Sequence, residues 1–191
     1  MTSVTIFGSG NMGTAIDGVL SAGGAEVQHI GSADTNATVA GDIVVLAVPY
    51  PAQADIAATY GPQLAGKTVV DISNPLNFET FDSLTVPADS SAAAELAATL
   101  PSSTVLKAFN TTFAATLGAK EVGPNKTTVL IAGDDADAKA SLAAAISAGG
   151  VDAIDVGSLS RARELEAVGF LQLTLAVGEK IGWTGGFGVV R

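Results

Sequence analysis

The sequence Val4-Thr-Ile-Phe-Gly8-Ser-Gly10-Asn-Met-Gly13 places an apolar β-strand directly before a G-x-G-x-x-G turn, and residues 14–22 after it favour a helix. Strand, glycine turn and helix in this order are typical of a dinucleotide-binding site rather than of an ordinary strand-to-helix turn. Gly8 allows the sharp turn, Gly10 has no Cβ to hold a diphosphate away from the backbone, and Gly13 allows close packing. The free N–H groups at the start of the helix would then face the phosphates. The cofactor-binding residues predicted in this turn are Gly8, Ser9, Gly10, Asn11, Met12 and Gly13.

The composition limits the size and the class of the protein. A chain of 191 residues is long enough for one sizeable core but too short for two full α/β domains. Its net charge of -10, with only nine Lys and Arg, argues against a nucleic-acid surface, so an anionic cofactor must be held mainly by backbone dipoles. The chain has no Cys, which excludes disulfides, thiolate catalysis and Cys-based metal sites, and no metal site is predicted.

Seven apolar, β-branched runs bounded by Gly, Pro, Asn or Asp predict β-strands. They cover residues 4–7, 27–30, 43–48, 68–72, 105–109, 128–131 and 153–156. Ala-rich stretches between most of them predict helices over 12–22, 51–59, 91–100 and 136–148. Strands that alternate with helices indicate a mostly parallel sheet covered on both faces, which is the doubly wound Rossmann type of α/β fold.

Two linking segments depart from this alternation. Residues 31–41 are few and polar, so we expect a turn there in place of the usual crossover helix. Residues 75–90 predict a long loop, and long loops in compact domains are often functional. The longest apolar runs, such as residues 43–48, are far shorter than the roughly 20 residues of a membrane span, so no membrane association is expected. The first strand begins by Val4, which leaves no room for a signal peptide, and we expect a cytoplasmic protein.

The character of the sequence changes after Gly157. We therefore predict a Rossmann domain over residues 1–157 and a C-terminal helical segment over residues 158–191. The helix in this segment is apolar on nearly every face over residues 168–177, so it must be buried, either within its own domain or against a partner chain. Of the two, we favour a homodimer over simple packing on the sheet.

Several motif-like features are interpreted as structural. Residues 61–68 match the P-loop pattern, but a helix precedes them and a strand follows, whereas a working P-loop has the reverse order. His29, the only histidine, is predicted in mid-strand with no metal-ligand pattern near it. The three carboxylates between residues 134 and 137 are typical of a helix N-cap and first turn rather than of a metal site. The absence of G-x-S-x-G argues against a hydrolase of the nucleophile-elbow type.

The residues that follow the strands should surround one crevice, because ligands of open parallel sheets lie beyond the carboxyl ends of the strands. Pro49 and Pro51 would hold Tyr50 so that its ring covers a flat part of the cofactor. Asn74 and Asn110 could bind a nicotinamide carboxamide or a substrate carbonyl, or could simply close their own turns. The binding residues predicted after the strands are Ser32, Val48, Pro49, Tyr50, Asn74, Pro75 and Asn110.

The end of the second strand indicates which nicotinamide nucleotide is used. An NAD site usually presents Asp or Glu there to the ribose 2′-OH, and a carboxylate would repel a 2′-phosphate. The sequence Gly31-Ser32-Ala33 presents no carboxylate, so NADP(H) is favoured, although Asp34 follows closely and no Arg or Lys lies beside Ser32.

Four motifs together resemble the deazaflavin (coenzyme F-420)-dependent NADP oxidoreductase family and its small bacterial dinucleotide-binding relatives. They are Gly8-Ser-Gly-Asn-Met-Gly13, Ala47-Val-Pro49-Tyr50, Asp71-Ile-Ser-Asn74-Pro75 and Lys107-Ala-Phe-Asn110-Thr111. The resemblance implies a Rossmann domain with a small helical C-terminal part, a dimer, and hydride exchange between NADPH and a flat acceptor. Family members commonly carry Arg or Lys for the 2′-phosphate where this chain has Ala33.

The function expected from the sequence is hydride transfer between NADPH and a small redox acceptor of the deazaflavin or flavin class. No catalytic residue is predicted, because stacking two flat rings face to face requires no obvious general acid. Two alternatives stay open: an imine or ketone reductase, which would need a proton donor, and an NADP(H)-binding sensor that never turns over. A short-chain dehydrogenase would need Tyr-x-x-x-Lys, which neither Tyr50 nor Tyr60 supplies.

Overall fold

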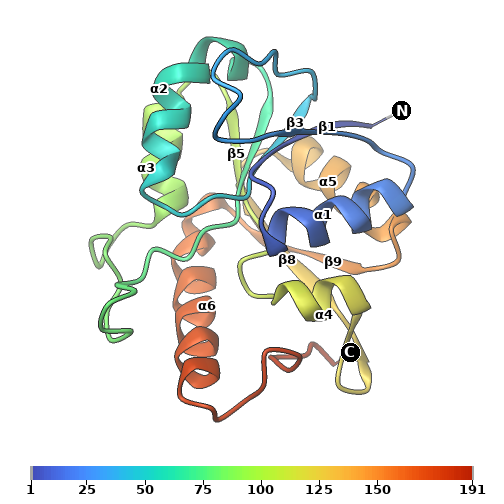
Figure 1. The fold of residues 1–191 in the computed structure, drawn as a ribbon, viewed down its shortest axis with the longest axis vertical. Helices are drawn as coiled ribbons and strands as arrows, with labels where there is room; N and C mark the ends of the chain where they lie inside the picture. The colour runs from blue at the N-terminus through green and yellow to red at the C-terminus, as the bar shows by residue number, and fades with distance from the viewer. Residues whose placement is uncertain (1, 191) are drawn as a thin grey trace.

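A seven-stranded sheet forms the centre of the molecule in the computed structural model (Figure 1). The structure describes residues 2–190. Met1 of the predicted Rossmann domain and Arg191 of the predicted C-terminal segment lie outside the described residues. The strands are β1 (Ser3–Phe7), β2 (Glu26–Ile30), β3 (Ile43–Leu46), β4 (Thr68–Asp71), β5 (Thr104–Lys107), β8 (Thr128–Gly133) and β9 (Asp152–Gly157). Their order is β2-β1-β3-β4-β5-β8-β9, and all neighbours are parallel except β5 and β8. This confirms the predicted Rossmann-like α/β fold with its mostly parallel sheet.

Helices cover both faces of the sheet. One face carries α1 (Asn11–Ala22), α4 (Ala114–Ala119) and α5 (Ala136–Ala148), and the other carries α2 (Ala52–Leu64), α3 (Ala92–Thr99) and the start of α6 (Ala162–Val177) (Figure 1). Alternate strand residues supply the two cores, since Val45 packs with the first group of helices and Val44 with the second. Both side chains are fully buried, as expected for a parallel sheet between two layers.

Helix α2 is longer than the sequence predicted. The expected end was residue 59, but the helix continues through Pro62 to Leu64. Pro62 lies on the exposed side, where its missing N–H costs one helical hydrogen bond, while the fully buried Leu64 keeps the last turn against the sheet. The P-loop-like residues 61–68 are therefore the end of α2, a short turn and the first residue of β4, in the order that excludes a P-loop.

The segment between β5 and β8 contains elements that the sequence analysis missed. It forms α4 and a small hairpin of β6 (Glu121–Val122) and β7 (Asn125–Lys126). This excursion returns the chain so that β8 runs antiparallel to β5. Strand β5 also ends at Lys107, two residues before its predicted end, because Phe109 adopts a φ of 64° and turns the chain.

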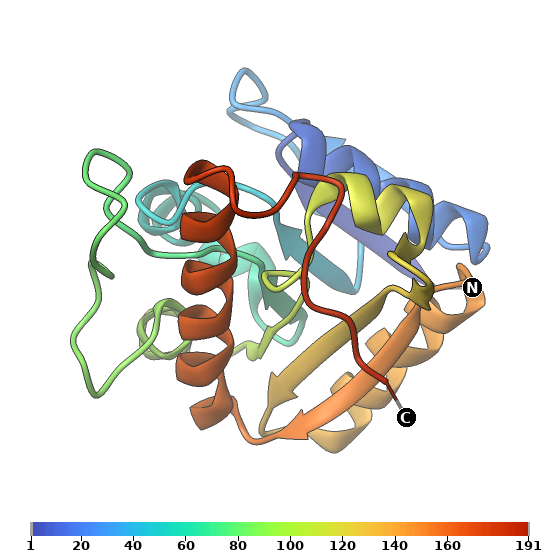
Figure 2. The same cartoon turned by 90° about the horizontal axis from the view of Figure 1, so that it is seen from below.

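The two predicted links lack helices, as expected. Residues 31–42 contain only turns between β2 and β3, and residues 75–90 form a loop with a single bridge between Leu76 and Leu84. This loop projects from the body of the molecule next to α6 (Figures 1 and 2). Within residues 2–190, no helix has the length and apolar character needed to cross a membrane.

Helix α6 is only partly covered. Its inner side, with Leu165, Gly169 and Ala176, is buried, whereas Val168 and Leu171 on the outer side are 37% and 51% exposed. The expectation that every face of this helix is buried is therefore not met within one chain. The tail that follows α6 crosses toward the β6–β7 hairpin, as Figure 2 shows.

Candidate dinucleotide-binding site

The glycine turn lies where the order of the sheet reverses. Strand β1 is flanked by β2 on one side and β3 on the other, so the connections after β1 and β3 diverge and leave a crevice at their carboxyl ends. The turn is fixed to both neighbours: the Gly8 N–H donates to the Ile30 carbonyl at 3.0 Å, and the Ala47 N–H donates to the Phe7 carbonyl at 2.9 Å. The crevice therefore has a rigid floor.

The three glycines of the turn have different roles. Gly8 has a φ of 103°, and a Cβ there would collide with the Ala47 carbonyl oxygen. A Cβ on Gly13 would lie 2.6 Å from the Gly8 carbonyl oxygen, so both residues are required by the fold itself. A Cβ on Gly10 would meet nothing within 4 Å. Gly10 is also the N-cap of α1, and no side chain caps the N–H groups of the first turn of this helix. The open space at Gly10 and these free N–H groups lie at the same place, where a diphosphate would bind.

His29 supports this turn from β2. Its Nδ1 lies 3.2 Å from the Gly8 carbonyl oxygen and its Nε2 lies 3.0 Å from an Asp17 carboxylate oxygen on α1. The ring thus connects the glycine turn to the helix that follows it. These contacts support the structural role that the sequence predicts for this histidine.

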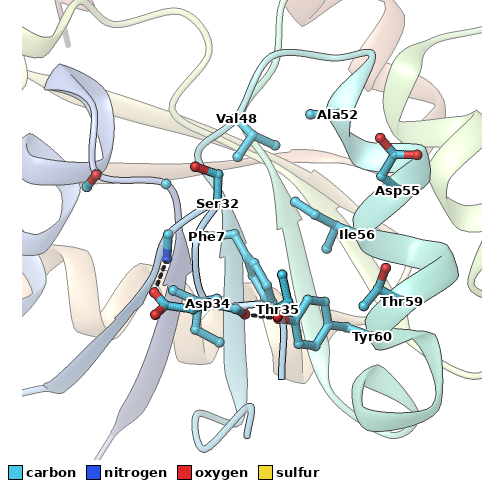
Figure 3. Close-up of a pocket in the computed structure, with 14 residues that line it drawn as sticks. Phe7, Ser32, Asp34, Thr35, Val48, Ala52, Asp55, Ile56, Thr59 and Tyr60 are labelled. Carbon is cyan, nitrogen blue, oxygen red and sulfur yellow. Dashed lines mark hydrogen bonds between the residues drawn. The ribbon is translucent and has the colours of Figure 1, made fainter. Parts of the chain in front are cut away.

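A cavity of about 500 Å³ lies on one side of the glycine turn (Figure 3). Predicted residues that line it are Gly8, Ser9, Ser32 and Val48. The other lining residues are Phe7, Ile30, Gly31, Asp34, Thr35, Ala52, Asp55, Ile56, Thr59 and Tyr60. Because the cavity begins at the glycine turn and ends against α2, it has the position expected for the adenosine end of a dinucleotide.

A second cavity of about 370 Å³ lies on the other side of the turn. Predicted residues that line it are Asn11, Met12, Asn74 and Asn110, and the rest of its wall is Ile72, Phe109, Thr112, Phe113, Ala114, Ala115, Leu173 and Trp183. No titratable side chain is among these described residues. The cavity therefore offers flat apolar walls and a few amide groups, which suits a planar ring better than proton-transfer chemistry.

The two asparagines of this cavity bind each other. Asn110 Nδ2 donates to Asn74 Oδ1 at 2.9 Å and to the Leu165 carbonyl at 2.8 Å, and Asn74 Nδ2 donates to the Asn110 carbonyl at 2.9 Å. The second of these bonds fixes the orientation of the Asn110 amide, because a carbonyl only accepts. The pair joins the ends of β4 and β5 to α6.

Neither cavity lining contains five of the predicted residues: Gly10 and Gly13 of the glycine turn, and Pro49, Tyr50 and Pro75. Tyr50 lines a separate space between α2 and α3, where its hydroxyl donates to the Glu95 carboxylate. Burial, together with this carboxylate, raises the pKa of Tyr50 to about 12. Pro49 is exposed at the surface, and Pro75 is buried with its carbonyl accepting from the Thr85 hydroxyl. Tyr50 points toward α3 because α2 begins two residues later and the phenol finds its hydrogen-bond acceptor there.

A buried ion cluster on the face of the sheet that carries α2 and α3 was not predicted as part of the site. The Lys107 ammonium lies 2.8 Å from Asp71 Oδ2 and 2.8 Å from Glu166 Oε1, and it also donates to the Ser73 carbonyl. All three ionisable side chains are at most 1% exposed. Burial raises the pKa of Glu166, although Lys107 opposes the shift. The sequence signal that could have indicated this cluster is a charged residue at the end of each of two apolar strands, Asp71 in one and Lys107 in the other.

Asp71 and Lys107 face each other because of the strand register. They are direct partners on β4 and β5, so both point to the same face of the sheet. Glu166 reaches them from the second turn of α6, and its other oxygen accepts from the Ala92 N–H at the start of α3 at 3.0 Å. One ammonium thus holds two strands and one helix together, and the N-terminus of a second helix supports the carboxylate.

Together, the sheet order, the glycine turn and the two cavities define a dinucleotide-binding protein of the Rossmann class. No protein-family model matches the chain. It is 32% identical to the F420-dependent NADP reductase of Methanocaldococcus jannaschii over 171 residues, which cover 87% of this chain and 76% of that protein. The chain belongs to the F420-dependent NADP reductase family, and it is an NADP(H)-dependent oxidoreductase.

Two solved structures and one further relative are similar. A protein of Arthrobacter sp. FB24, provisionally named an F420-dependent NADP reductase, has a TM-score of 0.84 at 25% identity and covers 100% of both chains. A hypothetical protein of Sinorhizobium meliloti has a TM-score of 0.69 at 28% identity over 84% of this chain and 87% of its own. Rat metalloreductase STEAP3 is 42% identical over 106 residues, which are 56% of this chain but only 20% of that protein. The chain thus spans one fifth of this metalloreductase.

Replacement of Gly10 should separate cofactor binding from folding. A Cβ at Gly10 meets no protein atom within 4 Å, so we expect Gly10→Val to change the melting temperature little, while the occupied space weakens NADPH binding by at least about tenfold. Calorimetric titration with NADPH measures the loss. Gly18→Ala, on an exposed and equally open position of α1, is the control and should leave binding unchanged. Unimpaired NADPH binding by Gly10→Val would contradict the site.

Loss of the Lys107 ammonium should destabilise the whole fold. Lys107→Met leaves two buried carboxylates without their shared cation, so we expect a loss of about 3–5 kcal/mol in the free energy of unfolding, measured in urea. Lys126→Met is the matched control, because the side chains of Lys126 and its partner Asp152 are 49% and 40% exposed and such a surface pair contributes less than about 1 kcal/mol. Equal losses in the two variants would show that the buried cluster is not a main source of stability.

Proposed function

We propose that the protein transfers a hydride between NADPH and a flat acceptor of the deazaflavin or flavin class. The observation that carries the proposal is the pair of cavities on either side of one glycine turn, because a dinucleotide extends across such a turn. The larger cavity suits the adenosine end, and the second cavity suits a nicotinamide ring with a second planar ring against it. The nicotinamide supplies the hydride when it is bound.

The first turn of α1 would hold the diphosphate through backbone N–H groups. Gly10 leaves the space open, and the positive end of the helix dipole attracts the charge. Ser9 and Ser32 line the adjoining cavity and can donate hydroxyl hydrogen bonds to the ribose and its phosphate. These residues orient the nucleotide without a cationic side chain.

The second cavity would position the two reacting rings. Met12, Phe113 and Trp183 provide apolar surfaces for stacking, and Trp183 is itself packed against Phe113 with ring centroids 5.0 Å apart. Asn74 and Asn110 provide the amide groups expected near a carboxamide or a ring carbonyl. These walls would hold planar groups face to face, which is the main requirement of hydride transfer.

The alternatives from the sequence analysis are less well supported by this cavity. An imine or ketone reductase needs a proton donor beside the substrate, and the cavity lining among the described residues contains none that titrates. Imine reductases share the fold, as shown by a TM-score of 0.66 at 16% identity to the enzyme of Bacillus cereus. A sensor that binds NADP(H) without turnover would have the same pocket, so only turnover distinguishes it.

A homodimer and a cytoplasmic location belong to the same proposal. The outer side of α6 exposes Val168 and Leu171, which lie three residues apart on one face of the helix and form a short apolar stripe. An exposed apolar stripe on a helix is typical of a partner interface. Because α6 also contributes Leu173 to the second cavity, pairing through its outer side would stabilise a wall of the site.

Turnover should depend on Trp183. We expect stopped-flow mixing with a deazaflavin or a flavin to oxidise NADPH, and Trp183→Ala to lower kcat/KM for the acceptor by about tenfold because a stacking surface is lost. Phe187→Ala, an exposed aromatic of the same tail that lies outside this cavity, is the control. If deazaflavins, flavins and ferric complexes all leave NADPH unoxidised, the sensor alternative is correct instead.

The oligomeric state should respond to the outer side of α6. Light scattering at micromolar concentration is expected to give the mass of a dimer, and Leu171→Asp, which places a charge on the exposed stripe, is expected to give a monomer. Ala140→Asp, which adds the same charge at an exposed position of α5 instead of α6, should keep the dimer. A monomer mass for the unmodified protein would reject the proposal.

A further inference from the structure

The first 66 of the 191 residues, which supply the whole lining of the first cavity, contain no Lys or Arg. The first basic residue of these two types is Lys67, after β1, α1, β2, β3 and α2 are complete. The same 66 residues carry the carboxylates Asp17, Glu26, Asp34, Asp42 and Asp55. Lys67 itself binds the Gly41 carbonyl at 2.7 Å and does not line the cavity. An anionic ligand therefore meets a surface with a negative formal charge.

Two of these carboxylates line the first cavity from different sides. Asp34 belongs to the turn after β2, and Asp55 belongs to the first turn of α2, as Figure 3 shows. Asp34 Oδ2 accepts from the Gly31 N–H at 2.8 Å, which fixes this carboxylate at the mouth of the cavity. No Lys, Arg or His is among the described residues of the lining. The donors that remain are hydroxyls and backbone N–H groups.

We propose that Asp34 and Asp55 determine the cofactor preference of this site. Their negative charges repel the 2′-phosphate and offset the binding free energy that its hydrogen bonds contribute. NADPH and NADH therefore bind with similar affinity, and higher ionic strength favours the binding of NADPH. The neutral donors that hold the phosphate against this repulsion are the hydroxyls of Ser32, Thr35 and Thr59. This inference rests on the proposed function, because it requires the adenosine end of the nucleotide in the first cavity.

The sign of the salt effect follows from the charges alone. A phosphate monoester carries about -1.5 to -2 charges at neutral pH. In a pocket with Arg or Lys, salt screens the attraction between this cation and the 2′-phosphate, and it weakens the binding of NADPH relative to that of NADH. In this cavity the charged lining residues are carboxylates, so salt screens their repulsion of the 2′-phosphate and strengthens the binding of NADPH relative to that of NADH. The diphosphate is common to both nucleotides, and its own salt dependence cancels in their ratio.

The test is the ratio of dissociation constants, NADH over NADPH, measured by calorimetry at several salt concentrations. We expect a ratio below about ten at low ionic strength that rises severalfold between about 0.02 M and 0.5 M salt. Asp34→Asn and Asp55→Asn should each raise the ratio about three- to tenfold at low salt and flatten its rise. Asn keeps an acceptor for the Gly31 N–H, so the turn after β2 is preserved.

Two further variants complete the design. Glu26→Gln removes the same charge from the exposed amino end of β2, away from the cavity, and should leave the ratio unchanged. Ala33→Arg adds a cation beside Ser32 and should reverse the salt dependence, so that the ratio becomes large and falls as salt is added.

The outcomes distinguish this inference from the proposed function. A ratio above about one hundred that falls with salt in the unmodified protein would overturn the inference while leaving NADP(H) use intact. No response of the ratio to either Asp34→Asn or Asp55→Asn would overturn the assignment to these two carboxylates. Failure of both nucleotides to bind would overturn the proposed function, and the inference with it.

Discussion

The rest of the site depends on the ion pairs that the buried Lys107 ammonium forms with two carboxylates. This ammonium joins Asp71 and Glu166, and therefore β4, β5 and α6, in a place where water cannot replace any partner. Such a cluster costs desolvation, so its advantage over an apolar contact is specificity: only one register of β4 against β5 and one rotation of α6 pair all three groups. With α6 fixed, Leu173 and the tail beyond it have a defined position against the glycine turn.

The parts of the fold that could be predicted are those determined by local sequence. Buried strands appear as apolar runs, and the glycine turn is recognised because each of its positions restricts the residue type. Helix α4 and the β6–β7 hairpin were missed because elements of two to six residues carry too little periodicity. The end of α2 was missed because burial of Leu64 outweighs the breaking tendency of Pro62, and burial is a tertiary property.

The candidate site shows the same division. Residues of the turn after β1, with Ser32, Val48, Asn74 and Asn110, line the two cavities because the carboxyl ends of neighbouring strands meet at one edge. The orientation of Tyr50 depends on Glu95, a partner 45 residues away on α3, and no spacing rule predicts that contact. The ion cluster is similar, because Lys107 and Glu166 are 59 residues apart and meet only after α6 has packed.

Under the proposed function, the acceptor would be selected by the C-terminal part of the chain. The nucleotide would be held mostly by backbone groups and a few small side chains, which proteins of this fold generally can provide. Structures that share only the fold, at 14–18% identity, include dehydrogenases, imine reductases and a pyrroline carboxylate reductase. In the proposed arrangement the wall opposite the nicotinamide would include Leu173 of α6 and Trp183 of the tail. A change of acceptor would then require new residues on these two segments and would leave the glycine turn as it is.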